Sequence, residues 1–165
     1  MCSRKGQVIG QVFIYILAII IFSLVLLYGY KTIKGFGKKA DEVILIQLTT
    51  DLRTAIKKIG SDYGTVTKKE LSIPGKYSYV CFVDLSYYPP PIDLDSEHPA
   101  VYNSWLDQAQ QNMFLITSKE EIEPYYIEGI SISVDPHYKC LNVIQGKILL
   151  RLEGKGDHVE LSEWE

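Results

Sequence analysis

One uninterrupted apolar stretch near the N-terminus constrains this chain more than any other feature. Residues 6–30 contain no charged side chain, and within residues 12–27 only Ser23 is strongly polar. A helix over residues 8–30 is about 35 Å long at ~1.5 Å per residue, which exceeds a bilayer core of about 30 Å. Because apolar residues occupy every face of that helix, the pattern predicts a transmembrane helix over residues 7–30 and not a buried core helix.

The segment before the apolar stretch is short, basic and free of acids. Residues 1–6 read Met-Cys-Ser-Arg-Lys-Gly. A secretory signal peptide would place a small-residue cleavage motif after its apolar run, and residues 28–34 contain no such motif. We therefore expect the helix to remain in the mature protein as a single-pass anchor.

This N-terminus resembles the class III signal peptide of archaeal type IV pilin-like proteins. In that family a basic residue and a glycine precede the cleavage site and a glutamine follows it, as Lys5, Gly6 and Gln7 do here. The resemblance implies that a prepilin-type peptidase removes residues 1–6 as a leader and leaves the helix attached. It also implies self-association of copies of this chain through the helix. The positions implied for that contact are Gln11, Phe13, Ile14, Leu17 and Ile20.

The chain departs from the family pattern at Gln11. The family usually places a glutamate at this fifth position after the cleavage site, and its carboxylate is thought to pair with the terminal amine of a neighbouring subunit. An amide can form hydrogen bonds but no ion pair. The resemblance therefore implies a filament or secretion-like structural subunit, and it leaves a main subunit, a minor subunit and a monomeric anchor all open.

Charge is divided sharply along the chain. All 20 acidic residues lie from Asp41 onward, together with 11 of the 17 basic residues, so this part carries a formal charge of −9. Nucleic-acid binding depends on Lys and Arg contacts to phosphate, so an acidic domain is a poor candidate for it. We expect the membrane, other copies of the chain and the peptidase as partners, and no nucleic acid.

Two signals disagree about the side of the membrane on which the C-terminal domain lies. Four lysines within residues 31–39 outnumber Arg4 and Lys5, and by the positive-inside rule this favours the cytoplasm. The pilin-like leader implies the opposite orientation, because its peptidase acts on the cytoplasmic side. We expect the head to be extracytoplasmic or on the cell surface.

Two cysteines remain after removal of the leader. Cys81 and Cys140 each lie in an apolar, strand-like run. They can form a buried thiol pair or a disulfide, and a disulfide requires an oxidising compartment. The disulfide is the expectation that agrees with an extracytoplasmic head.

The domain organisation follows from the glycines and the apolar periodicity after the anchor. Two glycines at positions 35 and 37 weaken the helix, so residues 31–40 are expected to form a basic juxtamembrane hinge. Asp41 is expected to cap a second, amphipathic helix over residues 42–59, which Gly60 ends. Its expected apolar stripe is Leu45, Leu48, Leu52, Ala55, Ile56 and Ile59.

The rest of the head, which we define as residues 41–165, has the pattern of short strands. Residues 65–73 and 77–84 are predicted to form a hairpin around the Pro74-Gly75 turn, with positive φ at the glycine. Residues 85–99 are predicted to be an exposed loop and residues 99–111 a short helix. Five further strands are predicted at 113–117, 129–134, 138–145, 147–153 and 158–161, with turns at 145–146 and 154–156.

The fold class that these elements predict is α+β. A long N-terminal helix, transmembrane and then amphipathic, is expected to pack on a small antiparallel β-sheet head.

Catalytic patterns are weak in this sequence. The three histidines, His98, His137 and His158, have no zinc-ligand spacing, and no nucleophile motif is present. We therefore expect no enzyme. Asp93, Asp95 and Glu97 alternate in the predicted loop, where their oxygens can converge on Ca²⁺ or form a solvated acidic tip. No other cofactor is expected.

A second hypothesis treats the chain as a monomeric, membrane-anchored binding module. Its expected partner surface is an aromatic and proline patch made of Tyr87, Tyr88, Pro89 and Pro90. Half-buried tyrosines at strand edges are the alternative interpretation of these rings.

Overall fold

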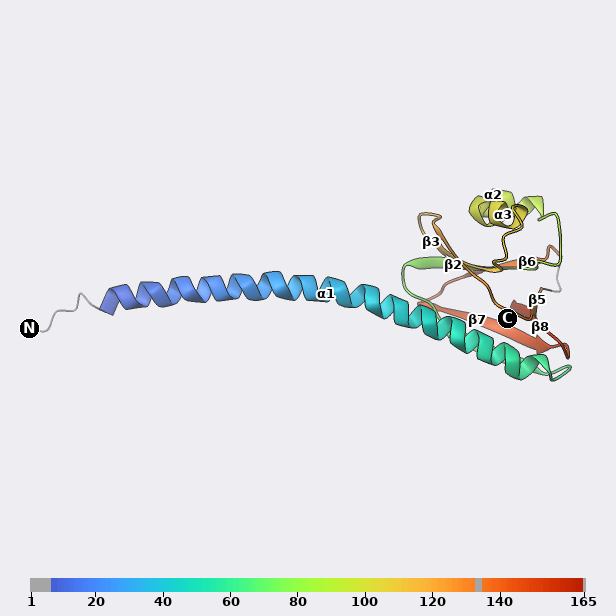
Figure 1. The fold of residues 1–165 in the computed structure, drawn as a ribbon, viewed down its shortest axis with the longest axis horizontal. Coiled ribbons are helices and arrows are strands. Elements are labelled where there is room, and N and C mark those ends of the chain that lie inside the picture. The colour runs from blue at the N-terminus through green and yellow to red at the C-terminus, as the bar shows by residue number, and fades with distance from the viewer. Residues whose placement is uncertain (1–6, 133–134, 165) are drawn as a thin grey trace, which may run out of the picture. The chain divides into compact units, whose positions relative to one another are not determined.

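The computed structural model describes residues 7–132 and 135–164, with side chains from residue 11 onward except in residues 33–38. The chain divides into two compact units, Met1–Glu42 and Val43–Glu165. The fold is α+β, as expected from the sequence (Figure 1). Helix α1, Gln7–Gly60, is by far its longest element.

The first unit contains the apolar part of α1. Gln11–Thr32 is long and apolar enough to cross a membrane, and none of it is buried. Ser23 remains compatible with hydrocarbon because its hydroxyl donates a hydrogen bond of 2.8 Å to the Ile19 carbonyl within the helix.

The expected interruption between two helices is wrong. The backbone stays helical through Gly35 and Gly37, and Asp41 lies inside α1, so it is not an N-cap. Each glycine costs about 1 kcal/mol relative to alanine, whereas a new helix start would require a costly new nucleus. The helix ends at Gly60, as predicted.

The second unit contains two four-stranded sheets, where the sequence suggested one. Sheet A has the order β1-β7-β8-β5 and sheet B the order β4-β3-β2-β6. All neighbouring strands are antiparallel except β5 and β8. The elements are β1 Val66–Ser72, β2 Tyr77–Val83, α2 Ile92–Glu97, α3 Pro99–Leu106, β3 Met113–Thr117, β4 Ile122–Tyr125, β5 Ile130–Ser131, β6 Tyr138–Asn142, β7 Lys147–Gly154 and β8 Val159–Glu163.

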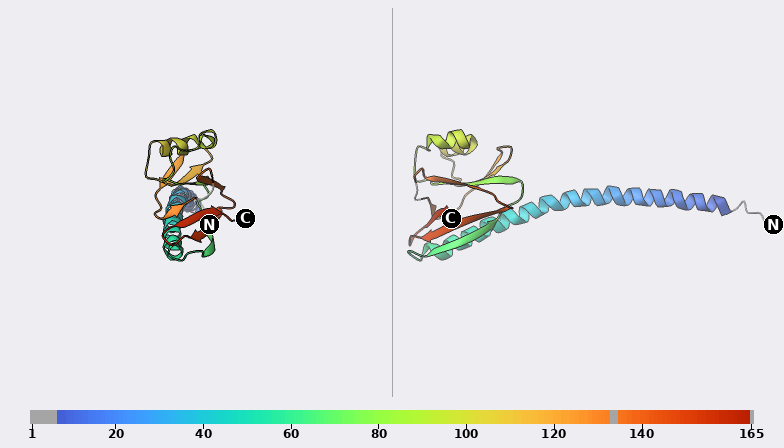
Figure 2. Two further views of the ribbon diagram at one scale, coloured as in Figure 1. Left: turned by 90° about the vertical axis from the view of Figure 1, so that its right-hand side faces the viewer. Right: turned by 180° about the vertical axis from the view of Figure 1, so that it is seen from behind.

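The main core lies where α1 meets both sheets (Figure 2). The predicted stripe supplies it: Leu48, Leu52 and Ile56 are buried, and Leu52 is fully so. Sheet A contributes the side chains of one of its faces to this core. In β7, for example, every second residue is buried. This periodicity of two is expected of a sheet with one face in a core.

A smaller second core covers the other face of sheet B. Val80 and Phe82 of β2 enter the main core, whereas Cys81 and Val83 enter the second. Helices α2 and α3 complete this second core with Leu94, Val101 and Trp105. Sheet B is therefore apolar on both faces, which explains the nearly continuous burial of β2 and β3.

The predicted hairpin of residues 65–73 and 77–84 is wrong. A turn does form, with the Tyr77 amide donating to the Pro74 carbonyl at 3.1 Å, but Gly75 lacks the expected positive φ. Strand β1 then pairs with β7, and β2 pairs with β3 and β6. A turn motif identifies a reversal of the chain, but not whether the two strands stay in one sheet.

Two further differences lie in the middle of the chain. The predicted loop over residues 85–99 contains α2, whose Leu94 is fully buried. Strand β4 was not among the predicted strands. It contains Pro124, which lacks a backbone donor, and it lies at the edge of sheet B, where proline is tolerated. Helix α3 begins at Pro99 as predicted and ends at Leu106, before residue 111.

We expect Leu52→Ala to destabilise the head by about 2–5 kcal/mol, because it leaves a cavity where α1 meets both sheets. Ile46→Ala is the matched control on the same helix. Ile46 is 66% exposed, so its loss is expected to change stability by less than about 0.5 kcal/mol. Urea unfolding of the full chain in detergent, followed by the fluorescence of Trp105 and Trp164, measures both changes in stability. Equal effects would contradict the proposed core.

Gly154 is expected to be intolerant of a side chain. A Cβ there would lie 2.2 Å from the backbone oxygens of Ile59 and Asp62. The backbone of one segment would have to move to relieve this clash. Gly154→Ala should lower the free energy of unfolding by at least about 2 kcal/mol. Gly75→Ala meets open space and should be nearly neutral in the same unfolding experiment. A neutral Gly154→Ala would show that α1 does not end against β7.

Candidate functional site

The exposed apolar surface of α1 is the most extensive candidate site. Phe13 and Ile14 are each 66% exposed, Leu17 is 45% exposed and Ile20 is 54% exposed. Phe13, Leu17 and Ile20 lie on one face of the helix, at spacings of four and three residues. A contiguous exposed apolar surface of this kind is typical of a membrane or protein interaction site. Gln11, at the start of this segment, is also exposed.

The implied processing site falls largely outside the described residues. Lys5 and Gly6 belong to residues 1–6, and Gln7 is the first residue of α1. Cleavage before Gln7 would therefore leave the helix beginning at the new N-terminus.

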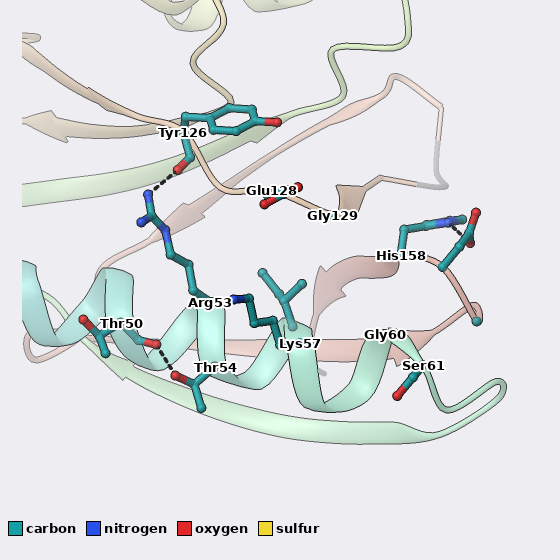
Figure 3. A pocket seen from close by; sticks show the side chains of 13 residues that line it. Thr50, Arg53, Thr54, Lys57, Gly60, Ser61, Tyr126, Glu128, Gly129 and His158 are labelled. Atoms are coloured by element: carbon teal, nitrogen blue, oxygen red, sulfur yellow. Dashed lines mark hydrogen bonds and ion pairs between the residues drawn. The ribbon is translucent and has the colours of Figure 1, made fainter.

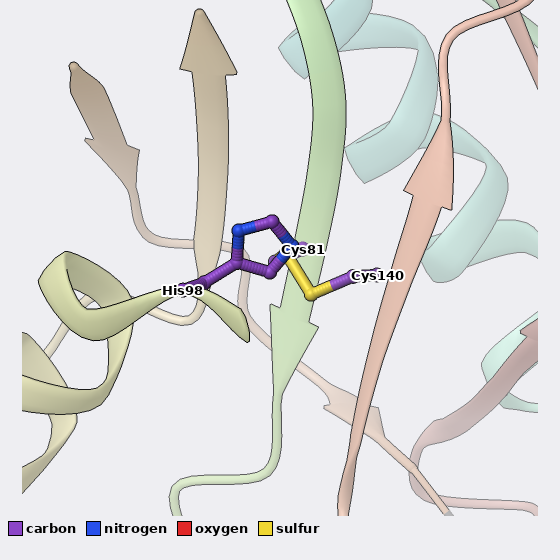
Figure 4. A group of neighbouring side chains, drawn as sticks. All are labelled: Cys81, His98 and Cys140. Atoms are coloured by element: carbon purple, nitrogen blue, oxygen red, sulfur yellow. A yellow bond between two sulfur atoms is a disulfide. The ribbon is translucent and has the colours of Figure 1, made fainter. Parts of the chain in front are cut away.

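The disulfide between Cys81 and Cys140 is present, as expected. The two residues lie directly opposite each other on β2 and β6, and the bond links segments 59 residues apart in the sequence. His98, from the junction of α2 and α3, lies beside it, so the three ligand-type atoms are within 4.8 Å of one another (Figure 4). The sequence spacing of the histidines did not indicate this cluster, because the junction reaches the cysteines only through tertiary packing.

A groove of about 880 Å³ lies along the C-terminal part of α1 in the second unit (Figure 3). Arg53 and Lys57 line it from the helix, Glu128 from the β4–β5 loop, and Asp157 and His158 from the β7–β8 turn. Positive and negative groups therefore face the same opening. Such a lining suits a polar partner more than an apolar one. The predicted apolar stripe of this helix gave no indication that Arg53 and Lys57 line a groove.

Polar contacts, two of them buried, hold the β4–β5 loop beside this groove. The Asn112 side chain donates a hydrogen bond of 2.8 Å to the Ile127 carbonyl and accepts one of 2.8 Å from the Ile127 amide. Arg53 donates from Nη2 to the Tyr126 carbonyl at 2.9 Å. The loop is thus fixed both from the core and from α1.

The expected calcium site is not assembled as predicted. Asp93, Asp95 and Glu97 lie on helix α2 and not in a loop. Residues two apart on a helix point to different faces, so Asp95 is directed away from Asp93 and Glu97. Of the residues described, the only metal-type cluster is the one formed by Cys81, His98 and Cys140.

The expected partner patch is only partly exposed. Tyr87 and Tyr88 are 40% and 55% exposed and Pro89 is exposed, but Pro90 is buried. The Tyr87 ring stacks on the His137 ring, with centroids 4.0 Å apart. One face of Tyr87 is therefore already covered within the chain.

Glu123 of β4 is the centre of a polar cluster that the sequence did not indicate. Glu123 accepts hydrogen bonds from the hydroxyls of Tyr77 and Tyr125 and pairs with Lys76 at 3.4 Å. Burial raises the pKa of Glu123, but the bonds from Tyr125 and Tyr77 and the Lys76 charge outweigh it, so its pKa is lowered overall. Burial and the neighbouring Glu123 raise the pKa of Tyr125.

No protein-family model, curated protein or solved structure matches this chain. The functional proposal below rests on the chain's own residues and geometry.

The Glu123 cluster predicts an acid-dependent contribution to stability. The pKa of Glu123 is lower in the folded state than in the unfolded state, where a glutamate has a pKa of about 4.3. The ionised carboxylate therefore stabilises the folded state fully at pH values above the unfolded pKa, and this contribution is lost as the pH falls through the folded pKa. Between about pH 5 and pH 3, the free energy of unfolding should therefore fall less steeply in Glu123→Gln than in the parent chain. Urea unfolding across this range measures the slope. Exposed Glu121→Gln is the control and should retain the parent slope.

Proposed function

We propose that this chain is a pilin-like, membrane-anchored structural subunit of a type IV pilus-like filament or a secretion-like assembly. The continuity of α1 is the observation that carries the proposal. One helix, Gln7–Gly60, contains both the exposed apolar segment and the buried stripe of the head. The same helix therefore supplies both the candidate association surface and part of the core of the head, which is what the proposal requires of a filament subunit.

The N-terminal sequence supports the same proposal. Lys5, Gly6 and Gln7 resemble the processing site of archaeal class III signal peptides. In the proposed assembly, apolar helices of neighbouring copies cover one another at Phe13, Leu17 and Ile20. Gln11 then contributes amide hydrogen bonds in place of the ion pair that the family's glutamate is thought to form.

We place the head outside the cytoplasm in this proposal. The Cys81–Cys140 bond favours an oxidising compartment. The implied peptidase cleavage requires the leader on the cytoplasmic side, which puts the other end of the helix across the membrane. The lysines of residues 31–39 then lie at the outer headgroups.

A monomeric, membrane-anchored binding module is the alternative function. The groove between Arg53, Glu128 and His158 favours it, because both charge signs line an opening large enough for a polar ligand. Filaments sheared from native cells would support the structural subunit. Monomers whose heads show a ligand-dependent rise in melting temperature would support the module. Neither proposal assigns the chain a catalytic activity.

The test of the proposed function is the N-terminus of the protein recovered from its native membrane. Mass spectrometry of the terminal peptide should find a start at Gln7, because the peptidase would cut after Gly6. Gly6→Leu should block cleavage and keep residues 1–6 attached, whereas Ser3→Ala should be processed normally.

A parent protein that starts at Met1 or Cys2 would overturn the processing and the filament model together. The lysines of residues 31–39 would then decide the orientation, with the head in the cytoplasm.

A further inference from the structure

Three potential metal ligands from separate parts of the sequence meet on the face of sheet B that α2 and α3 cover. Cys81 of β2 and Cys140 of β6 are directly opposed, and His98 approaches from the α2–α3 junction (Figure 4). We propose that Cys81, Cys140 and His98 form a zinc site when the disulfide is reduced. The same residues thus act either as a covalent link between strands or as a metal centre.

The spacing of the donor atoms fits a tetrahedral zinc ion. Zinc binds thiolate sulfur at about 2.3 Å and imidazole nitrogen at about 2.0–2.1 Å, so neighbouring donor atoms lie roughly 3.5–3.8 Å apart. The three donor atoms here already lie within 4.8 Å of one another. Once the sulfur–sulfur bond is cleaved, rotation of the two cysteine side chains can open the required space while β2 and β6 stay paired. Two sulfurs and one nitrogen leave a fourth position for water.

The scaffold holds the imidazole in place. The backbone amide of His98 donates a hydrogen bond of 2.8 Å to the Leu94 carbonyl. The His98 carbonyl accepts hydrogen bonds of 3.0 and 3.1 Å from the amides of Val101 and Tyr102. The ring packs against Tyr79, with centroids 5.2 Å apart. A ligand fixed in this way loses little freedom when a metal binds.

The electrostatic surroundings favour a cation. Helix α2 packs on this face of sheet B through Leu94, in the same core cluster as Cys81, and it carries the acidic residues Asp93 and Glu97. A divalent ion bound by two thiolates is neutral overall, and these nearby carboxylates add to its attraction.

The two states differ by two electrons and by the metal. A phosphine or dithiol reductant supplies two electrons, and with two protons the disulfide becomes two thiols. Zinc binding then releases both thiol protons and forms two zinc–thiolate bonds. A two-electron oxidant such as an external disulfide, which is itself reduced to two thiols, re-forms the Cys81–Cys140 bond and removes both thiolates, so the metal must leave. Bound zinc and the Cys81–Cys140 bond therefore exclude each other.

Cobalt and zinc titrations of the full chain in detergent test this site. A Cys2→Ser background leaves Cys81 and Cys140 as the only cysteines. After phosphine reduction, one equivalent of Co²⁺ should produce a thiolate charge-transfer band and the visible bands of tetrahedral cobalt, and Zn²⁺ should abolish both. The oxidised chain should show neither band. Competition with a chromophoric chelator gives the zinc affinity.

Histidine variants separate the site from simple thiol binding. His98→Ala should weaken zinc binding at least about 10-fold and change the cobalt spectrum. His98→Phe keeps a ring against Tyr79 and should lose affinity equally, which guards against misfolding in the alanine variant. His137→Ala removes an imidazole that also packs on a tyrosine, and it should bind as the parent does.

Three results would each overturn the proposal. The first is a reduced parent chain that gives no thiolate–cobalt band. The second is an oxidised chain that binds as tightly as the reduced one, since thiolates would then be unnecessary. The third is unchanged affinity in both His98 variants. The result of the N-terminal processing experiment has no bearing on these outcomes.

Discussion

The apolar stripe of α1 lies against both sheets, and this contact is the one on which the rest of the head depends. Sheet A has one strongly apolar face, and Leu150 and Leu152 of that face are buried in the same core as Leu52. A sheet with such a face needs another layer to cover it. Here the C-terminal part of α1 and sheet B share that role, so this part of the helix forms one layer of the head.

Sheet B then requires a second covering layer because its strands are apolar on both sides. Helices α2 and α3 provide that layer through Leu94, Val101 and Trp105. This packing also brings the α2–α3 junction, and with it His98, to the Cys81–Cys140 pair. The covalent link and the candidate metal ligands thus follow from the way one face of sheet B is buried.

The continuity of α1 connects this packing to function. The helix that contributes Leu52 and Ile56 to the core also carries Gln11–Thr32, whose side chains contact nothing that would bury them. Hydrophobic burial is therefore complete at one end of the helix and absent at the other. An exposed apolar surface of this extent is typical of a membrane or protein interaction site, and the proposed function would cover it with lipid and neighbouring helices.

The sequence by itself determined the elements that local periodicity controls. These are the apolar segment, the buried stripe ending at Gly60, most of the later strands and the two cysteines in apolar runs. Tertiary structure alone decided that β1 pairs with β7, that α2 lies within a proline-rich segment and that His98 reaches Cys140. The physical reason is distance along the chain. Hydrophobic patterns specify which face of an element is buried, whereas strand partners and side-chain clusters depend on the joint packing of all elements.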